Sequence, residues 1–301
     1  MSEARLALKV DCDTYQGTRR GLPVLLRLFD HFKIRASFFF TLGPDYSGRA
    51  IWRIVRQRGF LSKMIRTRAL SLYGVRTGLY GTLLPAPRIG QKLSPLIRSV
   101  GEAGHEVGVH GWDHVRWHDR LDRMSEEDVA RDYGDAQREF SRIFGRRARA
   151  SAAPGWQVTP TALTIQERYQ LLYSSNTRGG APFFPVAAGR RFSTLEIPTT
   201  LPTWDEVLGP GASGADGLLA RYRPLASGTS VHSIHTEVEG GAHAGSFRRL
   251  IEGWQSDGVE FVTLERIAQE TLENRSAVPT RSIVPIELPG RAGVVMGSEP
   301  G

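Results

Sequence analysis

Five side chains at the predicted ends of strands could carry out metal-assisted acid–base chemistry: Asp11, Asp13, His110, His114 and His235. Asp11 and Asp13 are two residues apart at the end of an apolar run, so in a strand their side chains point to the same side. His110 and His114 are four residues apart, where another predicted strand ends. One carboxylate with two imidazoles suits a divalent ion that keeps open positions for water and substrate. Such an ion acidifies water and polarises a carbonyl, so the pattern predicts a metal-dependent hydrolase.

Simpler interpretations compete with the metal hypothesis. An Asp-x-Asp pair is common near strand ends, and two histidines four residues apart can simply cap a loop. His118 continues the spacing of His110 and His114, as a surface stripe of histidines would. Cys12 should point away from its two aspartate neighbours, which argues against a cysteine nucleophile. The sequence contains neither a Gly-x-Ser-x-Gly elbow nor a phosphate-binding glycine loop. The metal hypothesis is preferred because all its features fall at strand ends.

Strand-like and helix-like segments alternate along most of the chain. The predicted strands cover residues 6–11, 36–42, 106–111, 148–153, 171–176, 194–201, 230–236 and 260–264. The helical segment at 125–144 has the clearest start, because Ser125 is the expected N-cap and acidic residues fill the first turn. This alternation predicts parallel βα units, and seven or eight of them favour an α/β barrel over an open sheet. In such a barrel the carboxyl ends of the strands form the active face, where the five candidate residues fall.

The length and composition are those of an ordinary globular protein, with 301 residues, of which 40% are hydrophobic. We expect one barrel domain over residues 1–273. Residues 274–301 contain Pro, Gly and Ser without a sustained period, which predicts a mostly disordered tail.

The positive charge is concentrated in one part of the chain. The net charge is +8, yet residues 47–92 contain ten Lys and Arg and no acidic residue. This points to a local anionic partner, which could be a membrane surface, a phosphate-bearing substrate or nucleic acid. Within it, residues 50–73 interleave apolar and basic side chains, as an amphipathic segment at a membrane surface does. A pair of helices packed on the barrel with a solvated basic face would give the same pattern.

Three features favour the cytoplasm as the location of the protein. No apolar run approaches the roughly 18 residues that span a bilayer. The chain starts directly with a strand-like segment and lacks the pattern of a signal peptide. Cys12 is the only cysteine, so an internal disulfide is excluded.

Four short motifs occur in the order Asp11-Cys12-Asp13, His110-Gly-Trp-Asp-His114, Ala153-Pro154-Gly155-Trp156 and Ile234-His235. On these motifs the chain resembles the polysaccharide deacetylase (NodB-homology) family, from about residue 6 to residue 272. The resemblance implies a distorted (β/α)7-type barrel of the polysaccharide deacetylase kind, with the basic amphipathic segment as an insertion at about residues 44–92. It also implies one divalent metal ion, which could be zinc, cobalt, manganese or nickel.

The resemblance also implies roles for individual residues. Asp11 matches the general base and His235 the general acid, while Asp13, His110 and His114 match the metal ligands. Residues expected to bind substrate or to support these groups are Pro154, Trp156, Asn176, Arg178 and Glu237. The sequence departs from the family pattern at Ala152, where an arginine commonly orients the base, and at Asn176, where a carboxylate often supports the acid.

Within the family the resemblance is closest to enzymes that remove the formyl group from 4-deoxy-4-formamido-L-arabinose-phosphoundecaprenol, through the stretches 36–40, 42–45, 104–110, 201–206 and 235–240. It implies an undecaprenyl-phosphate-linked amino sugar and an anionic membrane surface as partners, with no nucleic acid. The implied location is the cytoplasmic face of the bacterial inner membrane, as a peripheral protein. The implied role is lipid A modification, which gives resistance to polymyxin and cationic antimicrobial peptides. Two alternatives remain open: a deacetylase of peptidoglycan or chitin-like polysaccharide, and an inactive basic barrel that binds membranes or nucleic acid.

Overall fold

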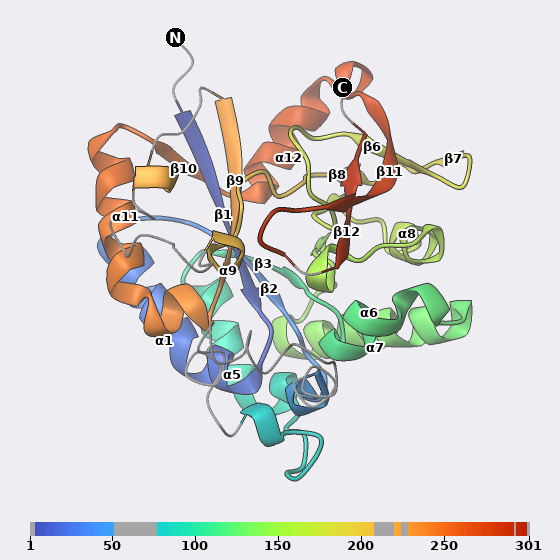
Figure 1. Cartoon of the computed structure of the whole chain (residues 1–301), viewed down its shortest axis with the longest axis horizontal. Helices are drawn as coiled ribbons and strands as arrows, with labels where there is room; N and C mark the ends of the chain where they lie inside the picture. The colour runs from blue at the N-terminus through green and yellow to red at the C-terminus, as the bar shows by residue number, and fades with distance from the viewer. Residues whose placement is uncertain (1–3, 51–76, 208–219, 224–227, 292, 300–301) are drawn as a thin grey trace.

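The computed structural model describes residues 4–50, 77–207, 220–223, 228–291 and 293–299 (Figure 1). Its centre is a curved sheet of eight parallel strands, which confirms the predicted α/β class and barrel-like fold. The strands are β1 (Ala4–Cys12), β2 (Ser37–Phe40), β3 (Glu106–Val109), β4 (Ala150–Ser151), β5 (Tyr173–Ser174), β8 (Leu195–Glu196), β9 (Gly228–His235) and β10 (Glu260–Val262).

Strand β1 organises this sheet. β9 pairs with β1 along its whole length, while on the other side β10 pairs with the first half of β1 and β2 with the second half. From β2 the sheet continues through β3, β4 and β5 to β8. The chain after β8 reaches β9, because Thr200 N donates to Val231 O at 3.1 Å and Val231 N donates to Thr200 Oγ1 at 2.8 Å. These bonds link the two ends of the curved sheet, so the strand ends surround one central space.

The helices lie outside the curved sheet, and Figure 1 shows α1, α5 and α11 on one side with α6, α7 and α8 on the other. The α-helices are α1 (Tyr15–His31), α5 (Ile89–Glu102), α6 (His114–Arg120), α7 (Glu126–Phe144), α8 (Pro160–Glu167), α9 (Trp204–Val207), α11 (Ala244–Ser256) and α12 (Leu264–Glu273). Shorter turns are the 3₁₀ helices η1 (Thr77–Leu79), η2 (Leu121–Arg123), η3 (Pro154–Trp156) and η5 (Arg275–Ala277), and the π-helical turn η4 (Val238–Ala242). The predicted cap of α7 is confirmed, because Ser125 Oγ accepts the backbone N–H of Asp128.

The alternation of side chains along β1 separates the core from the site. Leu8, Val10 and Cys12 belong to a large apolar cluster that includes side chains of α1, α5 and α11. Lys9 and Asp11 alternate with them and therefore point to the inner side of the curved sheet. Cys12 thus lies away from its aspartate neighbours, as the strand period predicts.

A second sheet corrects the prediction of a disordered tail at 274–301. It contains β6 (Phe184–Ala187), β7 (Arg190–Arg191), β11 (Thr280–Glu287) and β12 (Val294–Ser298), in the order β12-β11-β6-β7. β11 pairs in parallel with β6, and β12 turns back antiparallel to β11. The backbone of Arg178 bonds on the other side of β12, donating to Met296 O and accepting from Ser298 N. The tail is ordered because distant strands supply its hydrogen-bond partners. The local sequence of the tail does not reveal which strands these are.

The predicted amphipathic segment of the insertion falls largely on residues 51–76, which lie outside the described residues. At its described ends the insertion folds back on itself, with an antiparallel bridge between Pro44 and Arg88. Gly48 N donates to Tyr80 O at 3.1 Å, and the Tyr80 hydroxyl accepts the side-chain amide of Gln16 in α1. Among the described helices, none combines the length and apolar character needed to cross a membrane.

Candidate active site

Asp13, His110 and His114 converge at the carboxyl ends of β1 and β3. Asp13 Oδ1 lies 3.2 Å from His110 Nε2, and Asp13 Oδ2 lies 3.5 Å from His114 Nε2. One candidate ligand atom from each residue lies within 4.8 Å of the others. One carboxylate and two imidazoles therefore surround a single point, an arrangement that suits a divalent ion.

The hydrogen bonds of His110 test whether this set fits a cation. Its Nδ1 lies 3.0 Å from the carbonyl oxygen of Ala152, and a carbonyl only accepts, so Nδ1 carries the proton. In the neutral ring Nε2 then presents a lone pair, and it presents it to the carboxylate oxygen of Asp13. Two electron-rich atoms at this distance repel each other unless a positive charge lies between them. The backbone carbonyl thus orients His110 as a metal ligand is usually oriented.

Burial and neighbouring charges shift the pKa values of Asp13 and His114. Burial opposes the ionisation of Asp13, but His114, His110 and His235 together outweigh it and lower the pKa of that carboxyl. Burial lowers the pKa of His114 to about 4, against the attraction of Asp13. A deprotonated carboxylate beside a neutral imidazole is the protonation state in which both groups bind metal.

The loop that joins β3 to α6 is held by Asp132 of α7, a residue that the sequence analysis missed. Its buried carboxylate accepts the backbone N–H groups of Trp112 and Asp113 at 3.1 and 3.2 Å. Asp113 in turn caps α6, accepting the N–H of Arg116 at 2.9 Å. His114 is therefore the first residue of a capped helix on an anchored loop. The signal available in the sequence was an aspartate on the apolar face of a helix, between Val129 and Tyr133.

Asp11 is buried beside the metal set and has one oxygen engaged. Ser233 Oγ donates to Asp11 Oδ2 at 2.8 Å, and Lys9 Nζ lies 3.6 Å from the same oxygen. Asp11 Oδ1 is buried, lies 3.8 Å from His110 Nδ1, and has no hydrogen-bond partner among the described residues. One carboxylate oxygen is thus fixed, and the other is available to accept a proton.

Lys9 supplies the cation that the sequence lacks at Ala152. It is fully buried, and its Nζ donates to Ser175 O at 3.1 Å. Burial lowers the pKa of Lys9, while the charges of Asp11 and Glu196 raise it. The ammonium reaches Asp11 from its own strand, two residues earlier. The signal in the sequence was a lysine inside an otherwise apolar strand, in phase with Asp11.

His235 ends β9 in direct register with Asp11 on β1, and both side chains line the same cavity. The backbone N–H of His235 donates to the buried Glu239 Oε2 at 2.8 Å. The cavity has a volume of about 150 Å³, and its lining also includes Asp13, His110 and His114. All five residues singled out from the sequence therefore meet in one cavity.

Glu237 supports the loop of Asp13 rather than facing solvent. Its Oε1 accepts both the backbone N–H of Thr14 at 3.0 Å and the Thr14 hydroxyl at 2.6 Å. Burial and the nearby charge of Asp13 raise the pKa of Glu237 to about 7. A Cβ at Gly17 would lie 2.0 Å from Glu237 Oε1, so the first turn of α1 needs a glycine for this contact.

Pro154 and Trp156 form η3, whose loop borders the cavity. The backbone at Trp156 has φ 55°, and its indole Nε1 donates to Thr199 Oγ1 at 3.1 Å. Three cations surround the indole ring: Arg291 at 4.6 Å, Arg178 at 4.8 Å and Lys9 at 5.5 Å from its centroid. Arg291, from the connection between β11 and β12, also lines the cavity and was not predicted.

Asn176 and Arg178 serve the surrounding framework. Asn176 Nδ2 donates to Gln166 Oε1 at 2.9 Å. Arg178 Nη1 donates to both oxygens of Glu206 at 2.9 and 3.1 Å, inside the protein. Arg291 approaches the same Glu206 at 3.6 Å. Neither Asn176 nor Arg178 is among the residues lining the cavity.

His118 lies at the edge of the cavity, outside the three-residue set. Its ring stacks at 6.4 Å from that of His114, and its Nδ1 lies 2.7 Å from Asp119 Oδ1. A Cβ at Gly155 would collide with the His118 ring at 2.0 Å. The histidine stripe therefore divides, with two members facing Asp13 and the third bonded to Asp119.

Comparisons with known proteins agree with this geometry. A family model described as polysaccharide deacetylase matches residues 3–174. A protein of Shewanella sediminis (strain HAW-EB3) named "Probable 4-deoxy-4-formamido-L-arabinose-phosphoundecaprenol deformylase ArnD" is 38% identical over 292 residues, covering 96% of this chain and 93% of the relative. A protein of the same name from Wigglesworthia glossinidia brevipalpis is 30% identical, covering 92% of this chain and 96% of the relative.

Solved structures with lower sequence identity share the fold. The crystal structure of a "probable Polysaccharide deacetylase from Pseudomonas aeruginosa PAO1" has a TM-score of 0.61 at 17% identity, covering 92% of both chains.

Proposed function

The chain belongs to the polysaccharide deacetylase family, whose members are hydrolases of amide bonds, and on that premise we propose that it removes the formyl group from 4-deoxy-4-formamido-L-arabinose-phosphoundecaprenol. The product would be the free 4-amino sugar lipid. The observation that carries the proposal is the meeting of Asp11, Asp13, His110, His114 and His235 in one cavity. The formyl group and the lipid-linked sugar are taken from the names of the two relatives, which match nearly the full chain.

Asp13, His110 and His114 would hold one divalent metal ion, whether zinc, cobalt, manganese or nickel. When bound, such an ion supplies a Lewis acid that polarises the formyl carbonyl and makes an attacking water more acidic. His110 is buried, and Asp13 and His114 are partly exposed, so the set has a sheltered side for the ion and an open side for water and substrate.

Asp11 and His235 would move the protons. Asp11 Oδ1 accepts a proton from water as the water attacks the formyl carbon, while Ser233 and Lys9 hold Oδ2 in place. His235 donates a proton to the sugar nitrogen as the C–N bond breaks. The products are a neutral amine and formic acid, which loses its proton to solvent as formate, so no amide anion is released. Acid–base assistance of this kind accelerates a reaction by about 10²–10⁴-fold.

The decisive experiment is mass spectrometry of the formamido glycolipid after incubation with metal-loaded protein. Loss of the formyl group, with formate released, is the expected result. The matched control is Asp11→Asn, which should keep the metal and lose most of the turnover. Intact glycolipid under conditions that deacetylate N-acetylglucosamine oligomers would instead favour a polysaccharide deacetylase. Wild-type protein that takes up no divalent ion and is inert towards both substrates would favour an inactive binding barrel.

The proposed substrate also gives a setting for the protein. Its lipid is buried in a bilayer, so we propose that the enzyme works as a peripheral protein on the cytoplasmic face of the bacterial inner membrane. The product amine would place positive charge on lipid A, weakening the attraction of polymyxin and other cationic peptides. The sequence of residues 47–92, basic and without acids, supports contact with an anionic surface.

A further inference from the structure

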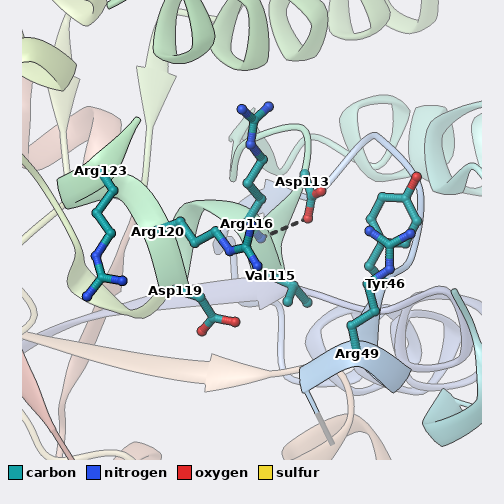
Figure 2. Close-up of a pocket in the computed structure, with 8 residues that line it drawn as sticks. All are labelled: Tyr46, Arg49, Asp113, Val115, Arg116, Asp119, Arg120 and Arg123. Atoms are coloured by element: carbon teal, nitrogen blue, oxygen red, sulfur yellow. Dashed lines mark hydrogen bonds between the residues drawn. The ribbon is translucent and has the colours of Figure 1, made fainter. Parts of the chain in front are cut away.

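A second cavity adjoins the metal-binding cavity on the other side of α6. It has a volume of about 560 Å³ and is lined by Tyr46, Arg49, Asp113, Val115, Arg116, Asp119, Arg120 and Arg123 (Figure 2). Four guanidinium groups and two carboxylates give the lining an excess of positive charge. Nothing in the proposed deformylation chemistry uses these arginines.

Helix α6 links the two cavities. His114 and His118 line the metal-binding cavity, whereas Val115, Arg116, Asp119 and Arg120 line the second cavity. Residues 114 and 118 share one face of a helix, and residues 115 and 119 lie about 100° further round it. The bond between His118 Nδ1 and Asp119 Oδ1 spans the boundary between the two. A ligand bound at the metal set could therefore reach the second cavity within the roughly 10 Å width of a helix.

The arginines differ in how strongly the protein already engages them. Arg116 Nη2 lies 2.7 Å from Asp128 Oδ2. Arg49 stacks on the Tyr46 ring at 3.9 Å and donates through Nε to Gly81 O, which leaves the rest of its fork facing outward. Arg120 is exposed at the end of α6 and makes no ion pair within the parts of the chain that the structure describes. Arg49 is thus held at the cavity with donors to spare, and Arg120 lines it with an exposed guanidinium.

From this geometry we infer that the second cavity binds the phosphodiester of the lipid-linked substrate, through Arg49 and Arg120. Guanidinium forks match the paired oxygens of a phosphate, and such charge-assisted bonds are stronger than neutral ones. The inference rests on the proposed function for the sugar that is attached, but the anion site itself rests on the arginines.

The position of the cavity also fits a lipid-linked ligand. Tyr46 and Arg49 lie at the start of the insertion, immediately before residues 51–76, whose sequence mixes apolar and basic side chains. A phosphate bound at Arg49 would sit across α6 from the formamido group at the metal set. The cavity at the metal set is smaller, about 150 Å³.

The test compares two substrates in the metal-loaded full chain. One is 4-formamido-arabinose linked through phosphodiester to a short prenol, and the other is the methyl 4-formamido-arabinoside, which has no phosphate. The Arg49→Gln/Arg120→Gln double variant should lower the ratio of kcat/KM between them at least tenfold, mainly through KM on the phosphodiester. Arg131→Gln/Arg138→Gln, on the exposed side of α7, is the matched control for net charge and should leave that ratio unchanged. An unaltered ratio in the Arg49→Gln/Arg120→Gln variant would overturn the inference, and so would an equal fall in the Arg131→Gln/Arg138→Gln control.

A binding experiment keeps this inference separate from the proposed function. Titration calorimetry with geranyl phosphate and with inorganic phosphate tests the cavity even if neither glycoside is hydrolysed. Wild-type protein should bind geranyl phosphate at least tenfold more tightly than the double variant does. Equal binding by the two proteins would overturn the anion site. If the wild type binds inorganic phosphate as tightly as geranyl phosphate, a free phosphate is the ligand. That result would overturn the inference that the cavity binds a lipid-linked phosphodiester.

Discussion

Asp11 is held between a hydroxyl and an ammonium, and this environment separates its two oxygens. Ser233 and Lys9 both approach Oδ2, while Oδ1 faces the side of His110. With Oδ2 fixed by these two contacts, the lone pairs of Oδ1 keep one direction. A carboxylate without them would rotate and spend time in orientations from which it could not accept a proton from the attacking water. The lysine therefore acts through Asp11 as a positioning residue.

Replacing Lys9 by methionine should lower kcat by roughly 10- to 100-fold, because small errors in the position of a reacting group have effects of this size. Bound metal should stay near one ion per chain, since Lys9 contacts none of the three proposed ligands directly. Lys9→Arg restores the cation and should recover part of the activity. Steady-state kinetics with metal analysis of each variant make the test. Equal losses in the methionine and arginine variants would show that Lys9 matters only for packing.

The three-residue metal set predicts a sharp difference between neighbouring histidines. His114→Ala should lose most of the divalent ion after dialysis, because two ligands hold an ion far more weakly than three. His118→Ala is the matched control on the same helix, and it should retain the ion because its Nδ1 is bonded to Asp119. Metal content measured by mass spectrometry distinguishes them. Equal retention of the ion by both variants would mean that His114 is not a metal ligand and would favour a surface stripe of histidines.

At the scale of elements, the turn between β11 and β12 brings Arg291 to the cavity. Gly290 has φ 83° and Gly293 has φ 85°, so both disfavour a side chain. A Cβ at Gly290 would lie 1.9 Å from Glu206 O, whereas a Cβ at Gly293 would meet no atom within 4 Å. Substituting each glycine in turn therefore distinguishes the cost of a side chain at positive φ from the cost of a collision with the backbone of Glu206.

Gly293→Ala should cost about 1 kcal/mol of stability, the usual penalty for an L-residue in this region. Gly290→Ala should cost about 3 kcal/mol, since displacing the backbone of Glu206 adds to the same penalty. Only Gly290→Ala should also reduce turnover, by moving Arg291 away from Trp156. Urea unfolding and steady-state kinetics measure the two effects. Equal destabilisation by the two substitutions would contradict the close contact with Glu206.

Glu106 connects four elements at the end of the sheet opposite the site. It accepts the hydroxyls of Ser37 in β2 and Tyr173 in β5, and the backbone N–H of Glu265 in α12. Burial raises its pKa to about 7 from an ordinary value of 4.5, against these hydrogen bonds. Between pH 4.5 and 7 the folded protein therefore holds a proton that the unfolded chain has lost.

This linkage fixes the sign of a pH effect on stability. The contribution of Glu106 is fully present below pH 4.5 and declines as pH rises through 7, by about 3 kcal/mol in all. Glu106→Gln removes this titration, so the stability of wild type relative to the variant should fall across that range. Urea unfolding at pH 5 and pH 8 gives the difference. A wild-type advantage that stays constant with pH would contradict the raised pKa.

The elements that the sequence predicts well are those whose signals are local. The strand ends near Asp11, His110 and His235 follow from apolar runs to within one residue, and the start of α7 follows from Ser125 and its acidic turn. The pairing of β11 with β6 joins residues nearly 100 positions apart, so no periodicity around Thr280 could reveal it. Lys9 and Asp132 did leave a local signal, a charge on an apolar face. Their partners, however, were set by tertiary packing that the sequence alone does not display.

At the scale of the whole molecule, the charge is divided between a nearly balanced barrel and a basic insertion. Ten of the 39 Lys and Arg residues fall within residues 47–92, where no acid occurs. The arginine-lined cavity begins at Arg49, on the same stretch of chain. Residues of the same stretch would therefore both bind a lipid-linked phosphate and attract the protein to an anionic bilayer.

This arrangement predicts binding to anionic vesicles that depends on the insertion. At about 50 mM salt the protein should float with vesicles containing phosphatidylglycerol, and at about 500 mM salt it should be released because screening shortens the reach of the charges. The Arg53→Gln/Arg56→Gln/Arg58→Gln variant should bind about 100-fold more weakly, since each basic residue near the surface contributes about 1 kcal/mol.

The matched control removes the same charge elsewhere, as Arg131→Gln/Arg138→Gln/Arg146→Gln, from exposed positions on and just after α7. If net charge alone drew the protein to the bilayer, both triple variants would lose binding equally, and the insertion would have no special role. If the insertion carries the contact, the control keeps most of its binding while the insertion variant is released. The variant should then also hydrolyse lipid-linked substrate in vesicles more slowly, yet match wild type on the methyl glycoside in solution, because that substrate needs no contact with a bilayer.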